Sequence, residues 1–259
     1  MRLFKTAILA TVFTATSTPA ISQSAVDDLI LYGEFNPPLT LIENDTIVGI
    51  LPDILTETLK HAGARKSRSD ITLVPWPRGY KAVQQRPNVL LFPMVRTPSR
   101  EKLFNWVGPV VSSLTVVIAK KSKHINIEKV EDLKNYVVGA VQYDIGAVAL
   151  EEAGLTPEEI FYVSAPNNGL QMLIHNRIDM WSYSRILAFW QLQSHGETLA
   201  DYEIVYTLRK GERYFAISKR TDPKAVDQLQ TALDAIRKDG LLQKAVDRYL
   251  PGGNLVTKR

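Results

Sequence analysis

The sequence predicts an α/β protein built mainly from parallel β-sheets. Short β-branched runs alternate with amphipathic stretches, and one run, Val89–Met94, is almost continuously apolar. Alternating strands and helices imply parallel sheets, and a continuously apolar strand is typical of a sheet covered on both faces. The alternation restarts near residue 114, which favours two sheets over one large doubly wound sheet.

Between residue 29 and residue 94, three strands and two helices are expected. Pro37-Pro38 ends the first strand, and Pro52 occupies a first-turn position of the first helix, where proline is favoured. The predicted strands are Leu29–Glu34, Ile71–Trp76 and Val89–Met94, and the helices are about Pro52–Ala62 and Arg78–Arg86.

The second half repeats the pattern and then closes with two helices separated at Gly240. The predicted strands are Leu114–Lys120, Val137–Gln142, Ile160–Ser164 and Asp179–Ser184, followed by extended runs Tyr202–Leu208 and Tyr214–Ser218. The helices are near Ile145–Ala153, Asn167–His175, Arg185–His195, Pro223–Lys238 and Leu241–Tyr249, and a structureless tail is expected over 251–259.

Residues 1–22 are interpreted as a secretory signal peptide. Arg2 and Lys5 form a positive start, a short apolar stretch follows, and Ala20-Ile21-Ser22 is a small-x-small cleavage site. Cleavage before Gln23 is expected, with cleavage after Ser24 as the alternative. The apolar stretch is much shorter than the roughly 20 residues that span a bilayer.

The composition is that of an ordinary globular protein. The 259 residues are 45% apolar and 22% charged, and 31 Lys and Arg against 27 Asp and Glu give a formal charge of +4. This mixture argues against wholesale disorder and against a multi-span membrane protein. The two short basic clusters, Arg65–Arg68 and Lys120-Lys121, form no continuous basic face, so no nucleic-acid partner is expected.

Common catalytic signatures are missing from the sequence. It contains no cysteine, which excludes disulfides, thiol catalysis and thiolate metal sites. The four histidines have no metal-ligand spacing, and there is no Gly-x-Ser-x-Gly, Walker or dinucleotide motif. We therefore expect no catalytic residue, no metal and no cofactor, and a secreted protein that is not an enzyme.

The most informative segment follows the apolar strand. Arg96 and Arg100 enter a loop at the carboxyl end of Val89–Met94, where ligands of open α/β sheets bind. The planar guanidinium of an arginine can hold a carboxylate through two parallel hydrogen bonds. A surface ion pair is the alternative for either arginine.

A series of motifs in colinear order resembles the family 3 extracellular solute-binding proteins, the periplasmic polar amino-acid receptors of ABC importers. Each motif is loose, but together they cover about residues 29–250. The matching stretches are Gly33-Glu34-Phe35-Asn36-Pro37-Pro38, Ile47–Leu55, Thr97-x-x-Arg100, Val130–Lys134 with Val137–Gln142, Asn176–Asp179 and Gly240–Tyr249.

The resemblance implies a two-lobed periplasmic binding protein of type II, with a mostly parallel sheet flanked by helices in each lobe. Lobe 1 would comprise about 25–109 plus 215–250, and lobe 2 about 115–209. Two connections, near Val110–Leu114 and Lys210–Tyr214, would act as hinges that close the lobes on a ligand.

The resemblance also assigns roles to individual residues. Arg100 matches the arginine that holds the ligand carboxylate, and the remaining ligand-binding candidates are Thr97, Val95, Gln142, Tyr143, Asp144 and Ser184. Gln142-Tyr143-Asp144 occupies the place where the family has Gln-Gly-Ser/Thr, and Asp144 is expected to cap the following helix. Ser184 occupies the place of the acid that binds the ligand ammonium, so the usual counter-charge is missing.

Further candidates come from the strand ends that the resemblance brings to the cleft. Trp76 is a candidate to stack on the ligand, with a core or rim aromatic as the alternative, and Arg78 is a candidate second cation, with a first-turn helix charge as the alternative. Phe35 and Asn36 complete the candidate set, and Glu34, Tyr80, Trp181 and Tyr183 are additional candidates for the cleft wall. Trp181 and Tyr183 should share one face of their strand and Ser182 and Ser184 the other.

The expected function is capture of a small carboxylate-bearing solute, amino-acid-like or another anionic metabolite, for delivery to an inner-membrane ABC permease. A monomer in the periplasm is expected. Two alternatives remain open: an enzyme similar to the secreted cyclohexadienyl dehydratases, and a receptor that presents its ligand to a membrane sensor.

Overall fold

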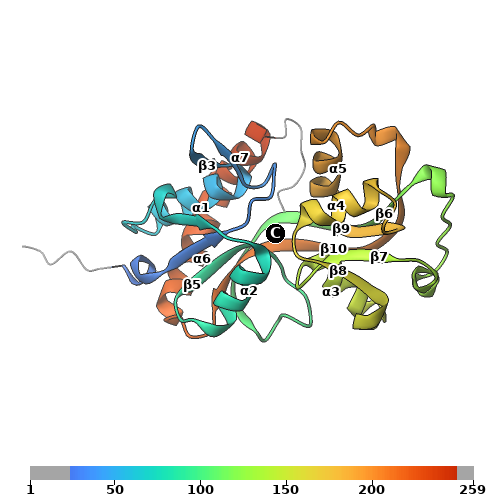
Figure 1. Ribbon diagram of the computed structural model, residues 1–259. Helices are drawn as coiled ribbons and strands as arrows, with labels where there is room; N and C mark the ends of the chain where they lie inside the picture. Colours follow the sequence, from blue (N-terminus) through green and yellow to red (C-terminus); the bar gives the residue numbers. More distant parts are fainter. Residues whose placement is uncertain (1–23, 250–259) are drawn as a thin grey trace, which may run out of the picture.

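The computed structural model describes residues 24–249, and these form two lobes joined by two long strands (Figure 1). Within these residues one sheet has eight strands in the order β4-β1-β5-β10-β6-β9-β7-β8. The predicted α/β fold with two connections is therefore confirmed. The expected signal peptide and the tail 251–259 lie outside the described residues.

The first lobe contains three parallel strands with helices on both faces. β1 pairs in parallel with β4 and with β5, and the hairpin β2–β3 precedes the first helix. The elements are β1 (Ile30–Gly33), β2 (Leu41–Glu43), β3 (Thr46–Val48), α1 (Ile50–His61), β4 (Ile71–Leu73), α2 (Trp76–Gln85), β5 (Val89–Val95), α6 (Pro223–Lys238) and α7 (Leu241–Tyr249).

The second lobe repeats this arrangement. β7 pairs in parallel with β8 and β9, and three helices cover the strands (Figure 1). The elements are β7 (Val138–Val141), α3 (Ile145–Glu152), β8 (Ile160–Val163), α4 (Pro166–Ile174), β9 (Met180–Ser184) and α5 (Arg185–Ser194). Helix α3 packs very closely on β9, because a Cβ on Gly146 would lie 2.2 Å from the carbonyl oxygen of Ser182.

The connecting strands β6 (Phe104–Lys120) and β10 (Tyr202–Ser218) are longer than the sequence pattern predicts. Gly108-Pro109 and the charged stretch 208–214 resemble breaks, but antiparallel pairing from Tyr202↔Lys120 to Ser218↔Phe104 keeps both segments extended. The strands of the two lobes therefore share one continuous hydrogen-bonded ladder, which corrects the expectation of two separate sheets.

A second correction concerns the start of α2. Trp76 is not the end of a strand but the first residue of α2, and proline follows it at a helical position that tolerates the missing N–H. The buried residues of α2 are Trp76, Gly79, Tyr80 and Val83, which have the spacing of one helical face. The residue at which α2 begins therefore decides which of its side chains lie on the buried face and which are exposed.

The expected break between the last two helices is confirmed. Gly240 has φ 72°, in the left-handed region that glycine adopts without steric cost, and it separates α6 from α7. Both helices pack on α1 and bury one apolar face each. No helix among residues 24–249 combines the length and the apolar character needed to cross a bilayer.

Candidate ligand site between the lobes

Arg100 lies in the loop after β5, and its side chain is almost fully buried, with 1% of its surface exposed. One terminal nitrogen donates to the backbone oxygen of Val95 at 3.1 Å, in the same lobe. The other donates to the backbone oxygen of Tyr143 at 2.5 Å, in the second lobe. Its Nε is also buried and has no hydrogen-bond partner among the described residues.

Aromatic rings surround this guanidinium. Its central carbon lies 5.4 Å from the ring centre of Tyr80 and 6.0 Å from that of Trp76, both from helix α2. Tyr143 of the second lobe stacks on Tyr80, with ring centres 5.5 Å apart and nearly parallel planes. Burial lowers the pKa of Arg100, while Tyr80 and Asp144 oppose this shift. The ring of Trp76 thus lies beside the guanidinium of Arg100, the predicted carboxylate-binding group.

Thr97 supports the loop that carries Arg100. Its hydroxyl accepts a hydrogen bond from the backbone N–H of Arg100 at 3.2 Å and bonds to the hydroxyl of Ser99 at 2.8 Å. Val95 contributes its backbone oxygen to the guanidinium rather than an N–H. Both residues are buried beside Arg100.

Tyr143 has a left-handed backbone conformation, which glycine adopts without steric cost. Its φ is 63°, in the left-handed region that costs a non-glycine residue about 1 kcal/mol or more. This conformation accompanies the bond between its carbonyl oxygen and Arg100 and the stacking of its ring on Tyr80. Gln142 beside it is exposed.

Asp144 stands at the N-cap position of α3, as expected, but its side chain makes no capping hydrogen bond. Its Oδ2 is buried without a partner among the described residues. Burial raises the pKa of Asp144, and the N–H groups of Ile145 and Gly146 and the charge of Arg100 oppose the shift. Asp144 thus lies in the electrostatic field of the candidate carboxylate-binding group.

A second buried guanidinium, Arg213, was missed in the sequence. It comes from β10, where one terminal nitrogen donates to the hydroxyl of Ser184 at 2.6 Å and the other to the backbone oxygen of Ser112 at 2.8 Å. Burial lowers the pKa of Arg213 to about 10, so the group is still cationic at neutral pH, and Asp144 opposes the shift. Ser184 therefore accepts from a protein cation at the place where the family has an acid.

The predicted second cation, Arg78, does not join this cluster. Its position in α2 lies off the buried face that carries Trp76 and Tyr80, and it is exposed. The structure gives its side chain no hydrogen bond or ion pair within residues 24–249. The helix begins two residues earlier than the sequence predicts, which turns this position away from Arg100.

Glu34, at the end of β1, is buried and belongs to a polar chain that crosses the lobes. Its carboxylate accepts from Asn36 Nδ2 at 3.1 Å, and the amide oxygen of Asn36 accepts from the hydroxyl of Tyr183 at 3.0 Å. Burial raises the pKa of Glu34 well above its usual value, and the nearby charge of Asp144 adds to this. Glu34 and Asp144 are therefore two carboxyl groups in one electrostatic neighbourhood.

Both faces of β9 contribute to the junction. Trp181 and Tyr183 stack on one face, with ring centres 4.6 Å apart, as the alternation predicts. Ser182 on the other face donates to the backbone oxygen of Gly146, and Ser184 bonds to Arg213. Tyr183 reaches Asn36 of the first lobe by its hydroxyl, whereas Ser184 reaches Arg213 of the connecting strand β10.

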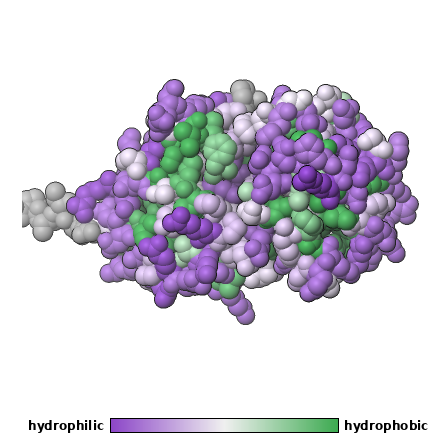
Figure 2. All heavy atoms as spheres, viewed as in Figure 1, coloured by the Kyte–Doolittle hydropathy of each residue, from purple (hydrophilic) through white to green (hydrophobic). Residues whose placement is uncertain are grey.

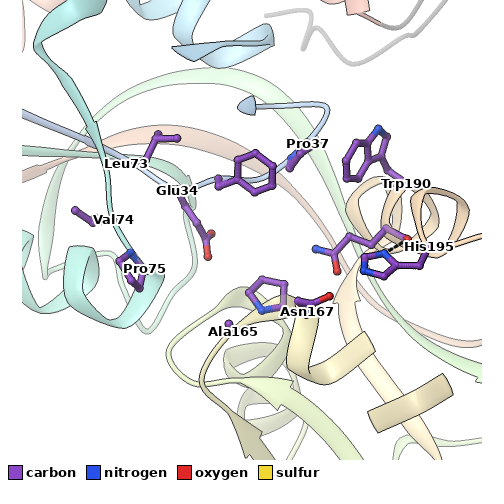
Figure 3. A pocket seen from close by; sticks show the side chains of 12 residues that line it. Glu34, Pro37, Leu73, Val74, Pro75, Ala165, Asn167, Trp190 and His195 are labelled. Carbon is purple, nitrogen blue, oxygen red and sulfur yellow. Dashed lines mark hydrogen bonds between the residues drawn. The ribbon is translucent and has the colours of Figure 1, made fainter. Parts of the chain in front are cut away.

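A cavity of about 490 Å³ opens next to Glu34, between the lobes (Figure 3). Glu34 faces it from the first lobe, and Trp190 and His195 face it from α5 and its C-terminal end. Phe35, predicted for the site, is 52% exposed and lines this cavity rather than the Arg100 cluster. The full lining is Glu34, Phe35, Pro37, Leu73, Val74, Pro75, Ala165, Pro166, Asn167, Trp190, Gln191 and His195.

A further contact across the lobes lies near Arg100. The hydroxyl of Ser99 donates to Glu152 of α3 at 2.6 Å, and Glu152 also accepts from Arg209 of β10 at 2.5 Å. Together with the bonds of Arg100 and Tyr183, this contact draws both lobes together around the cluster. No group of three or more histidine and carboxylate side chains within residues 24–249 is arranged to hold a metal ion.

Comparison with known proteins identifies the fold and the family. The chain is 24% identical over 161 residues to the probable amino-acid-binding protein YxeM of Bacillus subtilis (strain 168), a match covering 59% of this chain and 58% of that relative. A histidine kinase sensor domain with similarity to periplasmic binding proteins has a similar structure, with a TM-score of 0.76, 15% identity and coverage of 89% of this chain and 97% of that one.

A substrate-binding protein of an ABC uptake transporter from Streptococcus pneumoniae, solved with bound histidine, is also similar. Its TM-score is 0.75 at 18% identity, with coverage of 91% of this chain and 97% of that chain. At such identities these structures support the two-lobed fold alone. Residues 30–252 match the family model for bacterial extracellular solute-binding proteins, family 3, and the chain therefore belongs to that family.

Proposed function

We propose that this protein captures a small, carboxylate-bearing, amino-acid-like solute between its lobes and delivers it to an ABC importer. The candidate ligand-binding residues are Arg100, Thr97 and Val95 in the first lobe, with Arg100 for the carboxylate. On the second lobe they are Tyr143, Asp144 and Ser184, and Trp76 and Asn36 complete the wall. The relative named as a probable amino-acid-binding protein and the similar structure with bound histidine support a ligand of this class.

The observation that carries the proposal is the burial of Arg100. Its guanidinium lies beside the rings of Tyr80 and Trp76, it meets an oxygen atom of the opposite lobe, and one of its N–H groups has no partner among the described residues. A carboxylate offers two acceptor oxygens and a full negative charge to the same donors, and so is a stronger partner than a peptide carbonyl. Binding and contact between the lobes would thus use the same side chain.

The test is the Arg100→Ala variant. Loss of one partner of a buried charge pair costs about 2–5 kcal/mol, so affinity should fall at least about tenfold. Native mass spectrometry of protein purified without denaturation identifies a retained solute, and calorimetry with that solute measures the affinity of each variant.

Arg96→Ala is the matched control. Arg96 lies in the same loop, but it is partly exposed and pairs with Glu101 at 2.6 Å rather than with the opposite lobe. Its loss should leave the affinity nearly unchanged. Equal affinities of wild type and the Arg100 variant would refute the assignment of Arg100.

A second candidate function is presentation of the bound ligand to a membrane sensor. The similarity to a histidine kinase sensor domain favours this alternative, although it concerns the fold. Binding of the solute would use the same residues in either case. Co-purification with a permease supports transport, whereas co-purification with a sensor kinase supports signalling.

We propose no catalytic role for the site. The family and the curated relative are named for binding. An enzyme similar to cyclohexadienyl dehydratases would require an acid or base over the bound ring, and Glu34 and Asp144 are the groups to consider. Incubation with prephenate and arogenate, followed by absorbance, tests this alternative, and turnover of either compound would overturn the binding-only proposal.

A further inference from the structure

Tyr143 contacts the Arg100 cluster from the second lobe by two separate groups. Its backbone oxygen accepts a hydrogen bond from a terminal nitrogen of Arg100 at 2.5 Å. Its ring stacks on Tyr80 with ring centres 5.5 Å apart and planes 6° apart, and the ring of Tyr80 lies 5.4 Å from the central carbon of Arg100. One residue of the second lobe thus covers the guanidinium with a polar group and an aromatic group.

A tight turn directs both groups of Tyr143 toward the first lobe. Residues 141–144 lead from β7 into α3, and the backbone N–H of Asp144 donates to the backbone oxygen of Val141 at 3.0 Å. Tyr143 occupies the third position of this turn with φ 63°, where glycine or asparagine is usual. A tyrosine there has an unfavourable backbone conformation, and its contacts with Tyr80 and Arg100 help to offset that cost.

Tyr143 is the outermost member of this group of side chains. It is 47% exposed, whereas Arg100, Tyr80 and Trp76 are buried. The cavity beside Glu34 is lined by residues other than these four. A carboxylate can therefore reach the buried guanidinium only if a neighbouring group moves, and Tyr143 is the neighbour that solvent already reaches.

The two backbone oxygens that Arg100 meets differ in how easily they can be exchanged. The oxygen of Val95 lies in the same lobe as Arg100 and moves with it, whereas the oxygen of Tyr143 belongs to the opposite lobe. A carboxylate carries a full negative charge and forms a stronger hydrogen bond with a guanidinium than a peptide oxygen does. Exchange of a peptide oxygen for a carboxylate oxygen is thus easiest at Tyr143.

We propose that Tyr143 is an internal competitor of the ligand: it holds the lobes together on Arg100 in the free protein, and the ligand carboxylate binds by displacing its backbone oxygen. The inference rests on the proposed function, in which Arg100 binds that carboxylate. It refines the role of Tyr143 among the ligand-binding candidates. The residue lies in the site, but its contacts with Arg100 and Tyr80 lower the affinity of the site instead of raising it.

The sign of a mutational effect separates a competitor from a lid. A lid residue contacts the ligand in the bound state, so loss of its ring weakens binding. A competitor gives up its contacts when the ligand binds, so loss of its ring increases the fraction of protein that is competent to bind and strengthens binding.

Tyr143→Gly is the test variant, and Tyr143→Phe is the matched control. Glycine keeps the backbone oxygen and suits the turn but lacks the ring, whereas phenylalanine keeps the ring and lacks only the hydroxyl. A ring stack of this kind is worth about fivefold in an equilibrium constant. The glycine variant should therefore shift the lobes toward the open form by about fivefold, and the phenylalanine variant should not. Melting temperatures check that both variants are folded.

Spin labels measure the separation of the lobes without any ligand. The chain contains no cysteine, so Lys60→Cys on α1 and Gln193→Cys on α5 place one label on each lobe at exposed positions (Figure 1). Pulsed EPR should show mainly the short distance between the labels for the parent protein and for Tyr143→Phe. Tyr143→Gly should show a larger population at the long distance.

Binding is measured by calorimetry with pentanoate, and with pentanamide as its neutral counterpart. Tyr143→Gly should bind pentanoate about fivefold more tightly than wild type, and Tyr143→Phe should stay within about twofold of wild type. Pentanamide should bind each protein more weakly than pentanoate, because it brings no charge to Arg100.

Three results would overturn the inference. These are a parent protein without the short label distance, equal label distances in the parent and in Tyr143→Gly, and pentanoate binding that is absent, unchanged or weakened in Tyr143→Gly. If any of them occurs while Arg100→Ala weakens binding of the retained solute, the inference fails and the proposed function stands. If Arg100→Ala leaves the affinity for that solute unchanged, the proposed function fails as well.

Discussion

The two ends of the space between the lobes differ in how they are filled. At one end Arg100 bonds to the backbone of Tyr143, and the Tyr80–Tyr143 stack covers it. At the other end Glu34 borders an open cavity whose wall is largely apolar. The first end is packed protein against protein and is cationic, whereas the second is hollow and carries a carboxyl group.

This difference separates two requirements of a binding protein. The packed end can stabilise contact between the lobes, because the two terminal nitrogens of Arg100 and the rings of Tyr80 and Tyr143 already have protein partners. The hollow end can discriminate among ligands, because the space beside it belongs to neither lobe. Variants at the two ends should therefore affect stability and selectivity differently.

The largest effect is expected at Arg213, which supports the packed end from β10. Arg213→Ala removes the cation beside Asp144 and leaves the hydroxyl of Ser184 without its donor. A hydrogen bond donated by a charged group is worth about 1.5–3 kcal/mol, and Arg213 donates two of them, so the free energy of unfolding should fall by about 3 kcal/mol or more in urea titrations. Ser184→Ala, which keeps both charges, is the control and should lose much less; equal losses would contradict the assignment.

Glu34→Gln should increase the free energy of unfolding at neutral pH, because burial disfavours the charged form of Glu34. The pKa of Glu34 is higher in the folded protein than in the unfolded chain, so the folded state holds its proton more tightly. The stabilisation present below the unfolded pKa is lost as pH rises through the folded pKa. Without ligand, the variant should gain stability relative to wild type as pH increases, by less than Arg213→Ala loses.

Thermal unfolding of both proteins between pH 4 and pH 8 measures this gain. Because the charge of Asp144 acts on Glu34, the difference between the two proteins reports the titration of Glu34 together with its coupling to Asp144. A constant difference across the range would show that the folded protein does not perturb this carboxyl group.

The third variant pair separates the ring of Tyr143 from its backbone. Tyr143→Ala removes the stack on Tyr80, which is worth about 1 kcal/mol, but keeps the left-handed φ of 63° unfavourable. Tyr143→Gly also removes the ring but adopts this φ freely. The glycine variant should therefore be more stable than the alanine variant by about 1 kcal/mol. The reverse order would show that the backbone relaxes when the ring is absent.

The smallest effect is expected for Ser99→Ala. Its hydroxyl bonds to Glu152 across the lobes, but both residues are partly exposed and Glu152 keeps its bond to Arg209. Loss of one such bond should weaken ligand binding by about twofold to fivefold in calorimetry. A loss greater than tenfold would place Glu152 among the principal determinants of contact between the lobes.

Arg100 was predicted from a local signal together with the family resemblance. A buried apolar strand and the loop after it point to Arg96 and Arg100 alike, and the resemblance selects Arg100, which the structure buries there. The helices α6 and α7 were predictable from local signals alone, since Asp222, Pro223 and Gly240 mark their ends.

Arg213 and Gln191 could not be predicted in this way. Arg213 lies in the charged stretch 208–214, which is typical of an exposed loop, and only pairing of β10 with β5 and β6 buries it. Gln191 is one polar residue in an amphipathic helix, and its exposure depends on the other lobe. Arg78 failed for a related reason, because a shift of two residues in the start of α2 reverses the direction of a side chain.

The pairing of β6 with β10 along their whole length limits how the halves of the molecule can move. In a two-stranded antiparallel ribbon, sliding one strand along the other would break every backbone hydrogen bond between them. Twisting of the ribbon keeps these bonds and is therefore easier. Twisting is concentrated where the register of the pairing shifts, and one such shift lies between Arg213 and Phe215. The irregularity and the buried guanidinium of Arg213 therefore adjoin in one strand, so a twist of the ribbon at this point displaces the cation that bonds to Ser184.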